Sequence, residues 1–150
     1  MRRPDALLVG CLLLVAACEG PTPYVPRDAS SFFKQPGYRE LELSQDSYRV
    51  SYRCGQYTPA DRIADFTLLR CADLTQEQGF RYFVVEDVSD QTEWIPGGCV
   101  GLGSEGGYSV IVYTVQLLRE NPVDRLAVAY DAAVLERELR ARYSLPPRSP

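Results

Sequence analysis

Apolar and polar residues alternate along two adjoining stretches of the chain, and this pattern predicts a β-hairpin. Glu40 to Leu43 alternates, Ser44 to Asp46 has turn-forming residues, and Ser47 to Cys54 alternates again. Successive side chains of a strand point to opposite faces. One face of the second stretch is therefore apolar and consists of Tyr48, Val50, Tyr52 and Cys54. The other face is polar and basic and consists of Ser47, Arg49, Ser51 and Arg53.

The residues that follow the hairpin predict a helix over 59–78. Thr58 is a suitable N-cap, Pro59 suits the first helical turn, and Asp61 can complete a capping box. Gly79 tolerates the left-handed conformation that ends many helices. At about 100° per residue, small and apolar side chains share one arc of this helix: Ala60, Ile63, Ala64, Thr67, Leu68, Cys71, Ala72, Leu74 and Thr75.

Two large apolar residues of this helix, Phe66 and Leu69, lie outside that arc, so another part of the chain must shield them from solvent. A second helix near the C-terminus or the pair Phe32–Phe33 can supply this cover. Asp131 is a suitable cap for a helix over 132–142, which carries two i,i+4 Glu–Arg pairs. Residues 121–124 fit the pattern of a helix start equally well, and one longer helix is therefore the alternative.

Two further apolar stretches, 80–88 and 108–118, predict strands separated by a loop from Ser89 to Gly107. The pattern as a whole predicts an α+β domain over residues 37–143. We expect a mixed or antiparallel sheet of about four strands, one long helix packed on a face, and a shorter C-terminal helix. Residues 144–150 are predicted to be a disordered tail.

The N-terminal segment has the features of a targeting signal that is cleaved off, not of a transmembrane helix. The apolar run from Ala6 to Ala17 is about 18 Å long as a helix, too short for roughly 30 Å of hydrocarbon. Val15-Ala16-Ala17-Cys18 has the form of a bacterial lipobox, so residues 1–17 are predicted to be a signal peptide and Cys18 a lipidated first residue. An ordinary secretory signal is the alternative. A second match to the lipobox pattern ends at Cys11, but too few apolar residues precede it to form the hydrophobic region of a signal peptide.

Acyl chains on Cys18 predict a location at the cell membrane, facing the periplasm. Each buried methylene contributes about 0.8 kcal/mol, and two or more chains give stable attachment. Glu19, where a retention signal favours aspartate, favours the outer membrane over the inner. Residues 18–36 are rich in proline and are predicted to be a tether of up to about 55–60 Å. Within it, Phe32 and Phe33 either pack on the domain or dip into the membrane.

The amino-acid composition disfavours or excludes several classes of function. The chain has a net charge of -4 and becomes more acidic once residues 1–17 are removed, which disfavours nucleic-acid partners. Histidine is absent, so histidine-based catalytic triads and zinc sites are excluded. Glu86 and Asp87 are adjacent on a predicted strand and so point to opposite faces. We therefore expect no enzymatic activity, no metal and no cofactor.

The cysteines suggest a disulfide. If the strands 47–54 and 80–88 are joined by the helix in a βαβ unit, they run parallel. Cys54 and the loop that contains Cys99 then lie at the same end of the sheet, and Cys71 lies toward the other. We expect a Cys54–Cys99 disulfide, since exported cysteines tend to pair, with Cys71 as a buried free thiol. Three reduced cysteines are the alternative.

The same loop offers two further features. Gly101 to Gly106 matches G-x-G-x-x-G but leads into a strand, whereas phosphate binding needs a helix at that point. Trp94, the single tryptophan, is either an exposed anchor for a partner or a lid over the sheet edge.

Several short stretches resemble a family of uncharacterised bacterial envelope lipoproteins. They are 37–38, 48–53, 68–75, 79–83 and 129–132. Cys54 and Cys71 stand where that family has glycine and alanine. The resemblance implies an anchored small domain and brings no activity or catalytic residues.

These features together suggest a non-enzymatic envelope lipoprotein with a structural or assembly role, acting by contact with an envelope protein or peptidoglycan. Trp94, Phe32 and Phe33 are the candidate contact residues. The alternative is a binding module for cell-wall or small-molecule ligands. A deep pocket among Tyr48, Tyr52, Tyr82 and Tyr113 would favour that alternative, and a filled core would favour the contact role.

Overall fold

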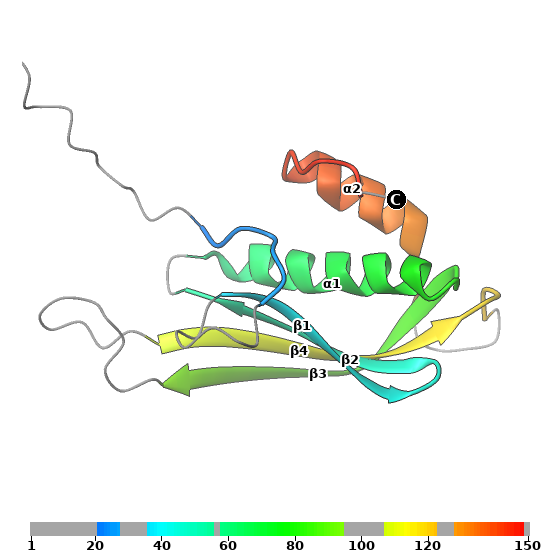
Figure 1. Cartoon of the computed structure of the whole chain (residues 1–150), viewed down its shortest axis with the longest axis horizontal. Helices are drawn as coiled ribbons and strands as arrows, with labels where there is room; N and C mark the ends of the chain where they lie inside the picture. The colour runs from blue at the N-terminus through cyan, green and yellow to red at the C-terminus, as the bar shows by residue number, and fades with distance from the viewer. Residues whose placement is uncertain (1–20, 28–35, 56–57, 95–106, 123–127, 149–150) are drawn as a thin grey trace, which may run out of the picture.

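The alternating stretches form one antiparallel sheet, and both helices lie on the same side of it (Figure 1). The computed structural model describes residues 21–27, 36–55, 58–94, 107–122 and 128–148, with the backbone alone for 91–94 and 107–108. Within these residues the elements are β1 (Gly37–Ser44), β2 (Ser47–Cys54), α1 (Ala60–Glu77), β3 (Tyr82–Trp94), β4 (Gly107–Leu118), β5 (Ala129–Asp131) and α2 (Ala132–Arg142). The predicted α+β class is confirmed, with five described strands in place of about four.

The sheet has the order β1-β2-β4-β3-β5. The predicted hairpin is present, with β1 and β2 paired from Gly37 opposite Arg53 to Ser44 opposite Ser47. β4 lies between β2 and β3 and is antiparallel to both. β2 and β3, the strands on either side of α1 in the sequence, therefore run in the same direction, as expected from the sequence.

α1 is sandwiched between the sheet and α2 (Figure 1). This placement explains why Phe66 and Leu69, outside the predicted arc, are fully buried. The Phe66 ring packs edge-on against Tyr143, at the end of α2, with the ring centroids 5.0 Å apart. Cover by the C-terminal helix, one of the two expected sources, is therefore confirmed. Thr67 and Thr75 are also fully buried, and their hydroxyls donate to the carbonyls one turn earlier.

The helix ends only partly follow the predictions. Asp131 caps α2 as expected, because its carboxylate accepts a hydrogen bond from the Val134 amide at 3.3 Å. Gly79 ends α1 with a φ of 75°, also as expected. The predicted capping box of Thr58 and Asp61 is wrong, since the N-cap residue of α1 is Pro59, without a side-chain cap, and the Asp61 carboxylate accepts from the neighbouring Arg62 amide. The Thr58 hydroxyl instead donates to the Thr22 hydroxyl and accepts from the Thr22 amide.

The second half of the sheet is larger than predicted. β3 continues to Trp94, so the loop expected from Ser89 begins six residues too early. Residues 129–131 form β5, which pairs with Tyr82–Val84, so one helix running on from 121–124 is excluded. β5 is too short for a periodic pattern, and its pairing with β3 decides its conformation.

Both ends of the described chain pack on the domain. Residues 21–27 fall in the predicted tether, yet Thr22 is buried and the Tyr52 hydroxyl donates to the Pro23 carbonyl at 3.0 Å. Residues 144–148 fall in the predicted disordered tail. Leu145 packs on the cluster around Tyr52 and Phe66, and the carbonyl of Pro146 accepts a hydrogen bond from Arg140. The tether and the tail were therefore predicted too long.

Leu69→Ala tests the layered core. Leu69 is fully buried on α1, the helix that lies between the sheet and α2, so we expect its truncation to lower the free energy of unfolding by about 2–5 kcal/mol. Leu43→Ala is the matched control, since Leu43 is 46% exposed, and should cost less than about 0.5 kcal/mol. Urea unfolding measures both. Equal costs would contradict the assignment of Leu69 to the core.

Candidate functional site

The face of the sheet turned away from the helices, called the open face below, is exposed around Arg39 and Arg49, and the strand registers place polar residues on it in rows. One row runs across four strands as Arg39, Ser51, Val112 and Ser89. The next row runs as Leu41, Arg49, Thr114 and Asp87. These side chains alternate with the buried ones on the same strands, so the hydrophobic pattern that fills the core also determines this polar face.

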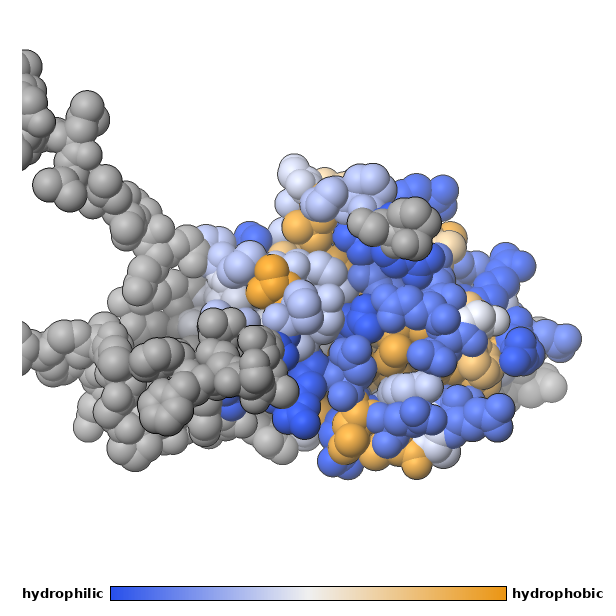
Figure 2. Space-filling view, viewed as in Figure 1, coloured by the Kyte–Doolittle hydropathy of each residue, from blue (hydrophilic) through white to orange (hydrophobic). Residues whose placement is uncertain are grey.

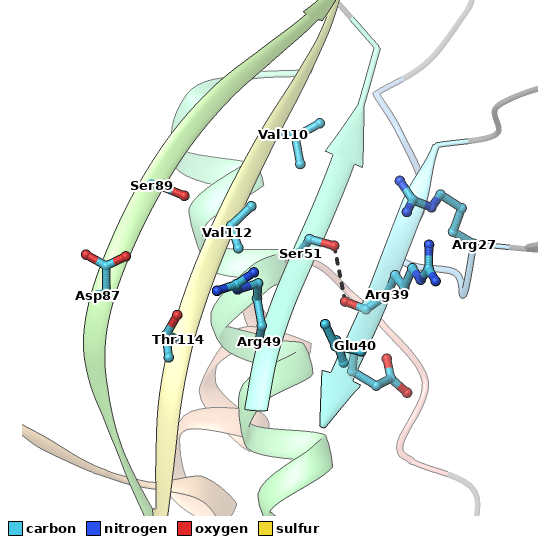
Figure 3. Close-up of a pocket in the computed structure, with 11 residues that line it drawn as sticks. Arg27, Arg39, Glu40, Arg49, Ser51, Asp87, Ser89, Val110, Val112 and Thr114 are labelled. Atoms are coloured by element: carbon cyan, nitrogen blue, oxygen red, sulfur yellow. Dashed lines mark hydrogen bonds between the residues drawn. The ribbon is translucent and has the colours of Figure 1, made fainter. Parts of the chain in front are cut away.

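The two rows line a hollow of about 430 Å³ (Figure 3). Val110 and Val112 of β4 form its apolar part, and Ser51, Ser89 and Thr114 add hydroxyl groups. The Ser51 hydroxyl donates to the Arg39 carbonyl at 3.2 Å. Toward the Cys54 end the face closes, since Val110 is only 4% exposed.

Arginines dominate the charge of this hollow. Arg27, Arg39 and Arg49 line it together with Asp87 and Glu40. In contrast to Arg70, Arg81, Arg140 and Arg142, none of the three forms an ion pair with a carboxylate of the described residues. Glu40 lies across the sheet from them, paired with Arg70 at 3.0 Å.

The electrostatics around Arg27 reflect this excess of positive charge. Burial and the neighbouring charge of Arg39 lower the pKa of the Arg27 guanidinium below its ordinary value. Two guanidiniums that repel one another form a place where an anion is stabilised.

Arg27 reaches the hollow because the segment before it is hydrogen-bonded to the edge of β1. The Tyr38 amide donates to the Val25 carbonyl at 3.0 Å, and the Arg27 amide donates to the Tyr38 carbonyl at 2.8 Å. Gly37 makes this close approach feasible. A Cβ at Gly37 would lie 2.5 Å from the Val25 oxygen, and its φ of 141° is unfavourable for other residues.

A second polar cluster lies on the opposite side, between α1 and α2. The Asp73 carboxylate, in the C-terminal part of α1, accepts a hydrogen bond from the Tyr24 hydroxyl at 2.6 Å. Arg140 of α2 donates to both Asp73 oxygens, at 3.0 and 2.8 Å. Glu136 pairs with Arg140 at 2.8 Å and accepts a hydrogen bond from Gln76. Every polar group of this cluster has a partner, so it is a structural network.

Burial decides the ionisation of this network. It raises the pKa of the Asp73 carboxyl, although the hydrogen bonds from Tyr24 and Arg140 favour the charged form. The pKa of Tyr24 is raised far above its ordinary value, by burial first and then by the charge of Asp73. Tyr24 therefore remains a hydrogen-bond donor throughout the physiological range.

Three of the four tyrosines considered as a ligand pocket are part of the packed interior, whereas Tyr82 is half-buried under the Arg81 guanidinium. Tyr48, Tyr52 and Tyr113 are buried, and Tyr48 and Tyr113 belong to one apolar cluster with Val50, Val115 and Leu117. The hollow described above lies on the other face of the sheet and contains none of these tyrosines.

The cysteines of the described chain are buried. Cys54 and Cys71 are free thiols with no exposed surface, and the Cys54 Sγ donates to the Ser109 carbonyl at 3.4 Å. Cys99, the predicted partner of Cys54, lies outside the described residues. The disulfide therefore stays a prediction.

Several other predicted residues also lie outside the described part. They are Cys18, Phe32, Phe33 and the glycines of 101–106. The backbone of Trp94 pairs with Gly107 at the end of β3, and nothing further of Trp94 is described.

The remaining surface of the described chain offers few alternatives. Hydrophobic residues appear in small groups between hydrophilic ones (Figure 2). Among the described residues there is no group of three acidic or cysteine side chains arranged to hold a metal. Neither described helix is both long and apolar enough to cross a bilayer.

Comparison of the chain with protein-family models, with curated proteins and with solved structures finds no match. The site must therefore be interpreted from its own geometry. The sequence contained a signal for the hollow, because arginine and serine alternate opposite the apolar face of β2. The part contributed by Arg27 depends on its pairing with Tyr38, which no local pattern reveals.

Arg140→Ala tests the buried network. It would leave the Asp73 carboxylate, whose side chain is 4% exposed, without its ion-pair partner, and we expect a loss of about 3–5 kcal/mol in the free energy of unfolding. Arg142→Ala is the control on the same helix, since the Arg142 side chain is 59% exposed in its pair with Asp65. Thermal or urea unfolding should show a much smaller effect for Arg142. Similar effects would show that the network is not a major stabilising feature.

Thiol labelling tests the burial of Cys54 and Cys71. Burial raises the pKa of the Cys54 thiol to about 11 and raises that of Cys71 as well. At pH 8 only about one Cys54 in a thousand is then a thiolate, so iodoacetamide should not modify the folded protein at either residue. Reactivity should rise with pH and on unfolding. Peptide mapping measures this, and mapping without reductant also detects a Cys54–Cys99 crosslink.

Proposed function

We propose that the chain is a bacterial envelope lipoprotein, anchored by acyl chains on Cys18 and acting by contact rather than by catalysis. The observation that carries the contact role is the filled interior. Tyr52 is fully buried, Tyr48 and Tyr113 are nearly so, and the hollow lies on the open face of the sheet. A ligand would therefore meet the protein at its surface.

The packing of residues 21–27 on the domain supports a short linker between the domain and a lipidated Cys18. Thr22 is held by hydrogen bonds with Gly55 and Thr58, and three residues separate it from Cys18. Four residue steps span at most about 14 Å, so the domain would sit next to the bilayer rather than at the end of a long leash. We place the anchored domain in the periplasm, with Glu19 favouring the outer membrane.

The alternative is a binding module for cell-wall or small-molecule ligands. The hollow lined by Arg39 and Arg49 favours it, since its volume of about 430 Å³ falls in the range of small-ligand sites. In either role, as a contact protein or as a binding module, the expected partner is an envelope protein or peptidoglycan.

Cys18→Ser tests the anchor, and Cys11→Ser is the matched control. We expect wild type and Cys11→Ser to remain in the membrane fraction with the mass of a fatty-acylated Cys18. Cys18→Ser should carry no acyl mass. Mass spectrometry of the N-terminal peptide separates acyl anchoring from retention by an uncleaved segment 1–17. Equal membrane association of the two variants, with no fatty acid on either, would refute the proposal.

A further inference from the structure

We infer that the open face of the sheet docks on an anionic phospholipid surface, with Arg27, Arg39 and Arg49 contacting the headgroups. The inference deepens the proposed function, because it rests on anchoring at Cys18 to bring this face to the membrane. It concerns the orientation of the domain once it is anchored.

Charge complementarity is the first argument. Within the described part of the chain the three arginines have no carboxylate partner, and the repulsion between Arg27 and Arg39 is relieved by an anion. Asp87 is the one outward carboxylate in the same two rows. Basic side chains near an anionic leaflet each add about a fivefold increase in membrane partitioning. Phosphodiester groups present the oxygens that guanidinium groups bind in pairs.

The acidity of the whole chain does not oppose this contact. Its net charge is -4, but charges more than about 8–10 Å from the bilayer are largely screened at physiological salt. Most of the acidic residues that pair with Arg70, Arg140 and Arg142 lie in the helical layers, on the far side of the sheet.

Exposed leucines argue for a lipid surface rather than for a free anion. Leu41 stands between Arg39 and Arg49 on the open face and is 52% exposed. Leu43, two residues further along β1, is 46% exposed. Apolar side chains among basic ones are typical of surfaces that rest at the headgroup level.

The position of the anchor is the third argument. Thr22 contacts Gly55, directly after the end of β2, and Arg27 pairs with Tyr38 at the start of β1. These points lie at the same end of the sheet, since Gly37 is opposite Arg53. A chain leaving Thr22 for a lipidated Cys18 therefore keeps this end near the bilayer. Arg27 and, two residues after Gly37, Arg39 lie near this end.

Vesicle co-sedimentation of residues 19–150 tests the inference. This chain lacks the acylated cysteine and contains every contact described above. We expect it to sediment with vesicles of phosphatidylglycerol and phosphatidylethanolamine, to remain in solution with neutral phosphatidylcholine vesicles, and to be released by salt. Arg39→Gln/Arg49→Gln should lower the partition coefficient about 25-fold. Arg137→Gln, an exposed arginine of α2, is the control and should sediment as wild type does.

Three outcomes would overturn the inference. They are absence of sedimentation with the anionic vesicles, equal sedimentation with neutral ones, and equal behaviour of the double variant and Arg137→Gln. Release by inorganic phosphate, but not by sodium chloride of the same ionic strength, would indicate a site for single anions and would also overturn it. Because this chain has no Cys18, its result is independent of whether Cys18 is acylated.

Discussion

A buried carboxylate holds the two ends of the described chain on the domain. Asp73 lies about one turn before the end of α1, and its charge requires partners that the helix itself cannot supply. Tyr24 comes from the N-terminal segment and Arg140 from α2, while Arg148 donates to the Asp73 carbonyl. Leaving such a group unpaired would cost several kcal/mol, so segments far apart in the sequence are brought together at one point. The interaction specifies an arrangement even where its net contribution to stability is modest.

The consequence of this arrangement is an asymmetric sheet. α2 and both ends of the described chain gather around α1, so the helical side is covered, and Arg140 and Arg142 are paired there with carboxylates. The other side receives neither of the two described helices, and Arg39 and Arg49 stay exposed there without a described carboxylate partner. Tyr24 and Arg27 belong to the same short segment, so the network that orders Tyr24 also helps to place Arg27 at the edge of the open face.

Local patterns predicted the elements that are long and periodic. The β1–β2 hairpin, α1 with its end at Gly79, and the Asp131 cap of α2 all follow from residues close in sequence. The failures share one cause, which is a partner far along the chain. Thr58 bonds to Thr22 instead of capping α1, and β5 exists because β3 offers it an edge. The length of β3 likewise follows from its pairing with β4.

The candidate site likewise combines features that local sequence predicts with features that depend on distant parts of the chain. The alternation in β2 predicted a face with Arg49 and Ser51, but not that this face would lack a helical cover. The resemblance to envelope lipoproteins predicted an anchored domain and carried no site. A long tether would have left the orientation of that domain free. If the chain is anchored at Cys18 as we propose, docking of residues 21–27 removes most of this freedom, because Thr22 lies only four residues after Cys18. The basic face and the net acidity of the chain would then give the domain one electrostatically favoured orientation against an anionic bilayer.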